Sequence, residues 1–223
     1  MKKQSLAAAF LAGALVLSSC GASNAVKGAG IGAAGGAVIG AGIGRVLGNT
    51  AVGAVVGGVV GGTAGTLIGK KMDKQKKELE RDVKDAKIES VNDGQAIRVT
   101  FDSGILFATG SASLSSTSQA TLRKFAANLS EHSDTDLMII GHTDNTGTDR
   151  VNNPLSYNRA ASVRSFLAGQ GVSSSRMKVE GKGSYEPVAD NSTVAGRREN
   201  RRVEVYILPS KEMVKAAQDG TLR

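Results

Sequence analysis

The 223-residue chain is poor in the residue types on which several common functions depend. It has one cysteine, two histidines, no tryptophan and 4% aromatic residues. A single cysteine excludes an intramolecular disulfide, and the shortage of aromatic rings leaves little on which nucleic-acid bases would stack. Beside that cysteine only His132 and His142 offer the nitrogen and sulfur ligands that zinc prefers. We therefore expect no metal, no cofactor and no nucleic-acid partner.

The N-terminus has the layout of a bacterial export leader. Two lysines precede an apolar run, residues 6–17, which is too short for an ordinary membrane span. The run ends in Leu17-Ser18-Ser19-Cys20, which resembles the lipobox at which a lipoprotein leader is cut before a cysteine that is then acylated. We expect residues 1–19 to be a signal peptide and Cys20 to be lipidated, with palmitate as an acyl chain. An ordinary secreted protein with a stray thiol is the alternative.

The residue after the cysteine points to the outer membrane. Gly21 stands there, whereas an aspartate at that position is associated with retention in the inner membrane. Loss of Lys2 and Lys3 with the leader lowers the formal net charge from +8 to +6. An exported basic protein suits an anionic lipid surface or a cell-wall polymer better than nucleic acid.

Residues 28–69 are glycine-rich, and most of their glycines recur at every fourth position. One series runs from Gly28 to Gly48 and a second from Gly53 to Gly69. Period four is close to a helical turn, so each series predicts a smooth stripe that another backbone can approach closely. We interpret the segment as a glycine-zipper hairpin of two helices about 30 Å long, in a membrane or a homo-oligomer. A flexible linker is the alternative, because each glycine costs a helix in water about 0.8 to 1 kcal/mol relative to alanine.

Two further segments connect the hairpin to its surroundings. Residues 20–27 are expected to tether it to the lipid. Residues 70–92 mix charges of both signs around Leu79, Val83 and Ala86, which form one narrow apolar stripe. We interpret them as a solvated, charged helical spacer about 30 Å long that holds the next domain away from the lipid.

Residues 93–209 alternate between strand-like and helix-like patterns. Branched and aromatic residues predict strands at 96–101, 136–140, 177–180 and 203–208. Helical spacing of apolar residues covers 117–130, and a second helix is expected to start near Pro154 and to end at Gly169 or Gly171. This alternation indicates an α+β sandwich of one domain's size.

Several motifs of this domain occur together in one known family. They are Ile105-Leu106-Phe107, the GHTDNTG stretch from Gly141, Asn152 with Leu155-Ser156 and Arg159-Ala160, Gly171-Val172, Gly181-Lys182-Gly183, Gly196-Arg197, and Asn200-Arg201-Arg202-Val203-Glu204. On these motifs about half of the chain resembles the OmpA-like peptidoglycan-binding domain of the OmpA/MotB C-terminal type. With the lipobox and the zipper in front, the whole resembles YiaD-type lipoproteins. The resemblance implies a βαβαββ sandwich; Pro154 and the tail, residues 210–223, depart from the family pattern.

The resemblance also implies a binding site. In the family, the residues that match Asp144 and Arg159 bind the diaminopimelate of the peptidoglycan stem peptide. That ligand carries an ammonium and a carboxylate on one carbon, which an aspartate and a planar guanidinium can take respectively. We expect three further residues in the contact set: Thr143, Asn152 and Leu155. Alternatively, Asp144 and Arg159 pair with each other or with Asp149, as surface charges commonly do.

These features together predict a lipid-anchored outer-membrane protein whose C-terminal domain lies in the periplasm. It would bind peptidoglycan non-covalently and tie the membrane to the wall. The alternative is an oligomeric membrane scaffold in which wall binding only positions the zipper. We expect no catalysis, because a wall hydrolase needs zinc ligands, a cysteine nucleophile or a paired acid and base. The basic run from Gly196 to Arg202 is interpreted as packing and internal pairing.

Overall fold

The computed structural model describes residues 62–108 and 110–222. The expected signal peptide, the tether and the glycine-rich segment up to residue 61 lie outside the described residues. Along the described chain the elements are α3 (Thr63–Asp82), β1 (Lys87–Val91), β2 (Ala96–Asp102), α4 (Ser103–Leu106), α5 (Ser116–Glu131), β3 (Thr135–Gly141), α6 (Asp149–Gly169), a 3-10 turn (Ser174–Arg176), β4 (Met177–Gly181), α7 (Val194–Asn200), β5 (Arg202–Pro209) and α8 (Lys211–Gln218). Among these residues, no helix has the length and apolar character that crossing a membrane requires.

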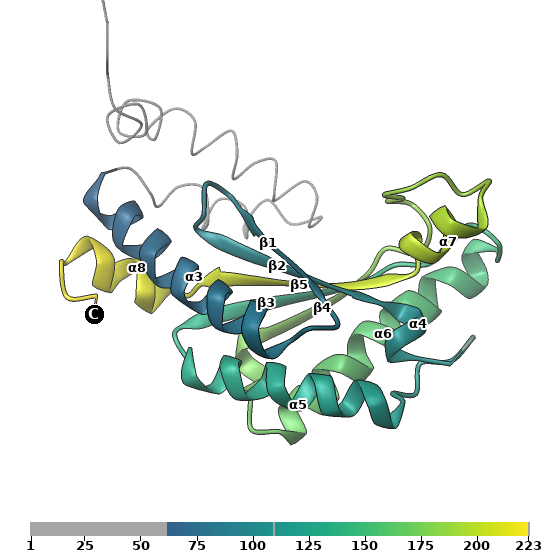
Figure 1. Cartoon of the computed structure of the whole chain (residues 1–223), viewed down its shortest axis with the longest axis horizontal. Helices are drawn as coiled ribbons and strands as arrows, with labels where there is room; N and C mark the ends of the chain where they lie inside the picture. Colours follow the sequence, from purple (N-terminus) through teal and green to yellow (C-terminus); the bar gives the residue numbers. More distant parts are fainter. Residues whose placement is uncertain (1–61, 109, 223) are drawn as a thin grey trace, which may run out of the picture.

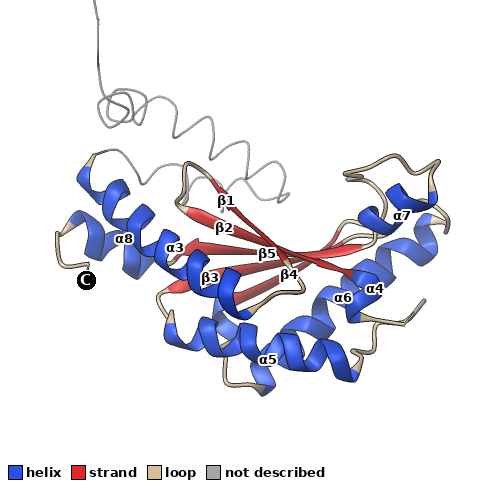
Figure 2. Cartoon of the chain, in the orientation of Figure 1, coloured by secondary structure: helices blue, strands red, loops and turns tan. Residues whose placement is uncertain are grey.

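The five strands form one mixed sheet in the order β1-β2-β5-β3-β4 (Figure 2). Strands β3 and β4 are parallel and are joined through α6, whereas the other neighbours are antiparallel. From β2 to β5 the chain follows the βαβαββ order that the sequence predicts, with β1 added at the edge. The α+β fold class is therefore confirmed.

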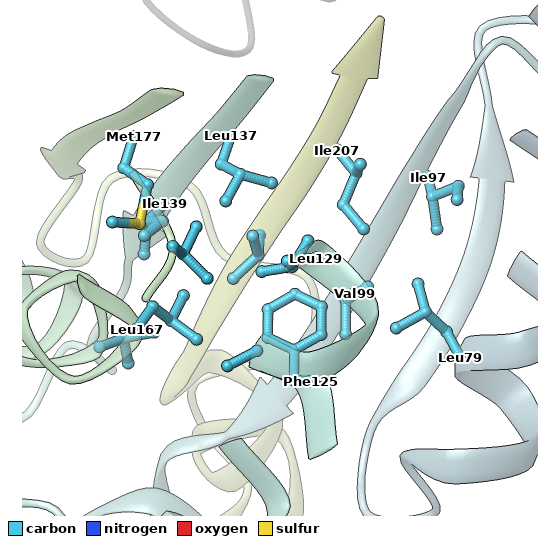
Figure 3. Close-up of a cluster of buried hydrophobic side chains, with 14 of the residues drawn as sticks. Leu79, Ile97, Val99, Phe125, Leu129, Leu137, Ile139, Leu167, Met177 and Ile207 are labelled. Atoms are coloured by element: carbon cyan, nitrogen blue, oxygen red, sulfur yellow. The ribbon is translucent and has the colours of Figure 1, made fainter. Parts of the chain in front are cut away.

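One face of the sheet carries the main hydrophobic core. Alternate residues of β2, β3 and β5 point into it, among them Ile97, Leu137 and Ile207 (Figure 3). Helices α3, α5, α6 and α8 all contribute buried residues to the same cluster. Phe101 and Phe125 meet edge to face with ring centroids 5.5 Å apart. The period-two burial of the strands thus places the helices on one face of the sheet.

The predicted spacer is wrong in two respects. The helix ends at Asp82, and residues 87–91 form the edge strand β1, which pairs with β2. The helix also does not stand clear of the domain as a spacer, because Ile68, Met72 and Leu79 are at most 1% exposed and join the core. These residues are spaced on one helical face. A boundary drawn at residue 70 leaves Ile68 outside and hides that stripe.

The tail, for which the sequence offered no counterpart, forms helix α8. Ser210 caps its start, with its hydroxyl accepting a hydrogen bond from the Met213 amide. Met213 and Ala217 are buried, and α8 lies against α3. The tail thus completes the core at the end of the sheet that bears the start of α3 (Figure 1).

Helix α6 starts five residues before Pro154, at Asp149, so the predicted start is also wrong. Thr148 is the N-cap residue, and its carbonyl accepts the amide of Asn152. Pro154 removes one interior hydrogen bond because it lacks an N–H group. The extra turn places Asp149 at the positive end of the helix dipole, where a carboxylate is favourable.

Helix α6 rests on the sheet through a backbone contact. A Cβ atom on Gly141 would lie 2.0 Å from the carbonyl oxygen of Ser156, and one on Gly181 would lie 2.6 Å from the amide nitrogen of Tyr157. Gly141 and Gly181 are partners in the register of β3 and β4. The Ser156 hydroxyl then accepts a hydrogen bond from Gly183 at 2.9 Å. Only glycine at the strand ends permits this approach.

Replacing Gly141 by alanine should therefore destabilise the domain. We expect Gly141→Ala to lower the free energy of unfolding by about 2 to 3 kcal/mol, because the new methyl group meets backbone that cannot rotate away. Gly169→Ala is the matched control, since a Cβ atom there meets nothing within 4 Å. Urea unfolding followed by circular dichroism measures both variants. Equal midpoints for the two would contradict the close contact.

Candidate functional site

The candidate site lies at the end of the sheet that bears α4 and α7, away from α8 (Figure 1). Asp144 is the third residue after the end of β3, and Arg201 immediately precedes β5. Because these two strands are antiparallel, the end of one and the start of the other meet at one edge. Arg159 reaches the same region from α6 and contacts Phe107 and Ser111, which follow α4. The fold thus brings together four separate stretches of sequence.

Asp144 is a buried carboxylate with most of its hydrogen-bonding capacity used. It is 5% exposed, and its Oδ2 atom accepts a hydrogen bond from Nη1 of Arg201 at 2.5 Å. Its Oδ1 atom accepts two, from the amide and the hydroxyl of Thr146. Burial raises the pKa of Asp144, but these hydrogen bonds outweigh burial and hold the pKa below its usual range. A carboxylate has about four acceptor positions, so one remains, on Oδ2.

Arg159 is a buried guanidinium with most of its donors unused. It is 3% exposed, its Nε donates to the carbonyl of Ser111 at 3.0 Å, and its Cζ atom lies 5.4 Å from the ring centroid of Phe107. Burial and the charge of Arg201 lower its pKa, while Asp144 raises it. Within the described residues, neither Nη atom has a hydrogen-bond partner. Both Nη atoms keep contact with solvent, because neither belongs to the fully buried side-chain atoms that lack a hydrogen-bond partner.

The two residues do not form an ion pair with each other. Among residues 62–108 and 110–222, no carboxylate lies within 4.0 Å of the Arg159 guanidinium, and Asp144 pairs with Arg201 instead. The alternative that Asp144 and Arg159 neutralise each other, or pair with Asp149, is therefore wrong for this structure. The site thus holds two guanidinium groups but one carboxylate, which pairs with Arg201 only, and this leaves an excess positive charge at Arg159.

The three further residues expected in the contact set have different surroundings. The side-chain amide of Asn152 donates to the carbonyls of Asp144 and Gly147, both at 3.1 Å, and so holds the loop after β3. The Thr143 amide donates to the carbonyl of Gly183, while its buried hydroxyl has no partner among the described atoms. Leu155 is half-buried on α6. Asn152 thus shapes the loop, and Thr143 and Leu155 remain predicted contacts.

Sequence reasoning missed Arg201. Its interpretation of the basic run as internal pairing fits Arg202, which is 4% exposed and donates to Glu204 at 2.6 Å. Arg201 is more open, with a side chain 38% exposed, and it faces Asp144 instead. The register pairs Gly141 with Val203, which brings Arg201 beside the loop after β3. Knowledge of that register would have identified Arg201, but the two strands are far apart in sequence.

His142 is the first residue after β3 and is 1% exposed. Neither ring nitrogen has a partner among the described atoms. Burial, together with the positive charges of Arg202 and Lys182, lowers the pKa of His142 to about 4, against the opposing charge of Glu204. In the described part of the chain, no three histidine, cysteine, aspartate or glutamate residues are grouped to hold a metal ion. His142 is therefore a neutral side chain that stays unprotonated at neutral pH.

Comparisons with known proteins match both parts of the chain. The OmpA family profile matches residues 106–201, and the YMGG-like Gly-zipper profile matches residues 1–73. Probable lipoprotein YiaD of Escherichia coli is 36% identical over 62% of this chain and 63% of its own length. Peptidoglycan-binding protein ArfA of Mycobacterium tuberculosis is 38% identical over 50% of this chain and 34% of its own length. This chain thus matches less than two thirds of either curated relative.

A solved structure agrees with the sequence matches. The cell wall anchor of the T6SS from Pseudomonas aeruginosa superposes with a TM-score of 0.54 at 32% identity. The match covers 60% of this chain and 96% of that one.

The buried histidine predicts a specific loss of stability in mild acid. In the folded protein the pKa of His142 is about 4, below its ordinary value of 6.5. Between these two pH values the imidazole is protonated in the unfolded chain and neutral in the folded chain. Stability should therefore fall as the pH drops, by about 2 kcal/mol between pH 7 and pH 5 from this group alone. In His142→Asn this contribution to the pH dependence of the unfolding free energy should be absent.

Urea unfolding at pH 7, 6 and 5 measures this effect. The test compares how steeply the unfolding free energy of each protein changes with pH. A destabilisation of His142→Asn that is equal at every pH therefore does not affect the result. The carboxylates that titrate at lower pH are common to both proteins. Parallel stability profiles for wild type and variant would contradict the assignment.

Proposed function

We propose that this chain, whose residues 106–201 belong to the OmpA family, is a peptidoglycan-binding protein of the bacterial cell envelope. Two of its matches carry wall-related names, a peptidoglycan-binding protein and a cell wall anchor. The match to the anchor covers nearly all of that structure. The basic balance of the chain suits an anionic polymer.

The observation that carries the proposal is the state of Arg159. Burying a guanidinium without a carboxylate partner costs free energy, which a ligand carboxylate would recover. Its Nε is already used, so the two Nη atoms present an end-on fork toward solvent. A fork of this kind binds a carboxylate through two parallel hydrogen bonds. The ligand group at Arg159 is therefore a carboxylate.

Asp144 supplies the complementary charge. Its remaining Oδ2 position accepts an ammonium group, while Arg201 and Thr146 keep the carboxylate ionised and fixed. An amino acid centre with both charges on one carbon satisfies both residues at once. The end of the diaminopimelate side chain in the stem peptide is such a centre. We therefore take diaminopimelate-containing peptidoglycan as the ligand.

The anchoring part of the proposal concerns residues outside the described range. Cys20 is the proposed lipidation site and would hold the chain at the outer membrane, with the domain in the periplasm. The described residues support this orientation. Lys71 of α3 pairs with Asp134 just before β3, whereas Asp144 follows the end of that strand. The segment that leads to the membrane and the wall site thus lie at opposite ends of the sheet.

Binding to isolated sacculi tests the two site residues. We expect wild-type protein to co-sediment with diaminopimelate-type sacculi, and Asp144→Asn and Arg159→Ala to bind at least about tenfold more weakly, because each loses a charge-assisted contact. Arg159→Lys should also be weak, since an ammonium cannot form the bidentate fork. Arg150→Ala is the matched control, an exposed arginine of the same helix.

The comparison is made at equal folded fraction, established from the unfolding midpoint of each variant. Equal retention of wild type, Asp144→Asn and Arg159→Ala would refute the site. Retention of wild type on sacculi with lysine in place of diaminopimelate would refute the proposed ligand while leaving wall binding intact.

The same sacculi test the expectation that the protein is not an enzyme. After prolonged incubation with the wild-type protein we expect no soluble muropeptides above the level of a protein-free sample. Chromatography of the supernatant provides the measurement, with a muramidase as positive control. Sustained release of muropeptides that depends on the added protein would overturn the expectation.

A further inference from the structure

The exposed large apolar side chains of the described domain gather at one end of the sheet. Within residues 62–108 and 110–222 they are Val151, Tyr157, Tyr185, Val188 and Val194, each more than half exposed. They belong to the first half of α6, the loop after β4 and the start of α7. These three stretches lie at the end that bears the candidate site (Figure 1). Single exposed apolar residues are common on protein surfaces, whereas their restriction to one end indicates a contact surface.

Two of these side chains are tyrosines, in a chain that has few aromatic residues. Tyr157 is 51% and Tyr185 62% exposed, and no other aromatic ring in the described part of the chain is exposed. The remaining rings, such as Phe101 and Phe125, are buried or half-buried. Apolar area in contact with water costs free energy, which a ligand that covers the two rings would recover.

Both tyrosines are placed by the contact between α6 and the end of β4. A Cβ atom on Gly181, the last residue of β4, would lie 2.6 Å from the amide nitrogen of Tyr157. Tyr185 closes the turn that begins at Lys182, because its amide donates to the Lys182 carbonyl at 3.1 Å. The two tyrosines thus stand at one junction of the fold, on neighbouring segments.

This junction adjoins the proposed ligand site. The carbonyl of Gly183, two residues before Tyr185, accepts a hydrogen bond at 2.8 Å from the amide of Thr143, which is adjacent to the aspartate of the site. Tyr157 is two residues before Arg159 on α6, a step that turns the side chain by about 200° around the helix. The charged pair and the tyrosines therefore flank the start of α6, across a helix about 10 Å wide.

The part of peptidoglycan that reaches this junction is its sugar. Diaminopimelate is the third residue of the stem peptide, which is joined to N-acetylmuramic acid through a lactyl ether. Two residues and the ether separate diaminopimelate from the sugar, an extended distance of about 10 to 15 Å. A stem peptide held between Asp144 and Arg159 is therefore long enough to place a sugar ring on the other flank of α6.

A tyrosine ring suits one face of a pyranose sugar. That face presents C–H groups, whose hydrogens carry a partial positive charge, and the face of an aromatic ring is negative. Exposed Asn153 and Asn158 border Tyr157 on α6 and offer amides to sugar hydroxyl and N-acetyl groups. A protein partner needs a continuous apolar surface, whereas rings with polar neighbours fit the alternating apolar and polar groups of a glycan.

We propose that Tyr157 and Tyr185 stack on sugar rings of the glycan strand whose stem peptide occupies the site at Asp144 and Arg159. The inference rests on the proposed function and adds to it a second part of the same ligand, the N-acetylated sugars. The stem peptide crosses the start of α6, with diaminopimelate on one flank and the glycan on the other.

Two soluble ligands separate the sugar contact from the peptide contact. One is the free stem tetrapeptide with diaminopimelate, and the other is the same peptide on its disaccharide of N-acetylglucosamine and N-acetylmuramic acid. Isothermal titration calorimetry measures the Kd of each for the full-length protein in detergent. We expect the wild type to bind the disaccharide peptide about tenfold more tightly than the free peptide, because the ring contacts add to the charged contacts.

Variants of the two tyrosines assign this difference in affinity. The double substitution Tyr157→Ala with Tyr185→Ala should bind the disaccharide peptide about tenfold more weakly than the wild type and leave the Kd of the free peptide unchanged. Tyr157→Phe with Tyr185→Phe is the matched control, which keeps both rings and should bind both ligands as the wild type does. Unfolding midpoints in urea establish that each variant is folded.

The outcomes distinguish this inference from the proposed function. Equal Kd values of the wild type for the two ligands would refute the sugar contact and leave the peptide site standing. Unchanged binding of the disaccharide peptide by the double alanine variant would also refute it, as would weaker binding of the free peptide, because the tyrosines would then shape the peptide site. Binding of neither ligand by the wild type would refute the proposed function and this inference together.

Discussion

The backbone contact between α6 and the strand ends is the constraint on which the site depends. Gly141 and Gly181 leave no room for a side chain, so the helix lies directly on β3 and β4. This contact fixes the start of α6 beside the loop that leaves β3, where Asn152 holds the carbonyl of Asp144. It also fixes the face of α6 from which Arg159 extends. The geometry between the two charged groups is thus set by glycines that touch neither of them.

Within that geometry, the charges of the site are kept apart instead of cancelled. Arg201 satisfies Asp144, whereas Arg159 is held by a carbonyl and an aromatic ring. A carbonyl and a ring fix the position of a guanidinium without neutralising its charge. A protein carboxylate in their place would have neutralised Arg159 in an internal ion pair and weakened its attraction for a ligand carboxylate. The cost of this incomplete pairing falls on the free domain, and a ligand carboxylate recovers it.

The parts of the fold that follow from local pattern were predictable, and those that depend on register were not. Alternation along β2, β3 and β5 identifies these strands and their inward residues. The proximity of Arg201 to Asp144 depends instead on how β5 is aligned with β3. The start of α6 depends on loop contacts that the spacing of apolar residues does not contain. Strand β1 mixes charged and apolar residues, and only its pairing with β2 makes it a strand.

The boundary of the domain shows the same distinction between composition and packing. Glycines give way to charges at residue 70, which suggested a boundary there. Composition of this kind reports mainly the solvent face of a helix, whereas the buried stripe of α3 runs without a break from Ile68 to Leu79. Helix α8 then packs against α3 and holds it to the sheet. The domain therefore includes part of the glycine-rich segment, because it already begins at Thr63.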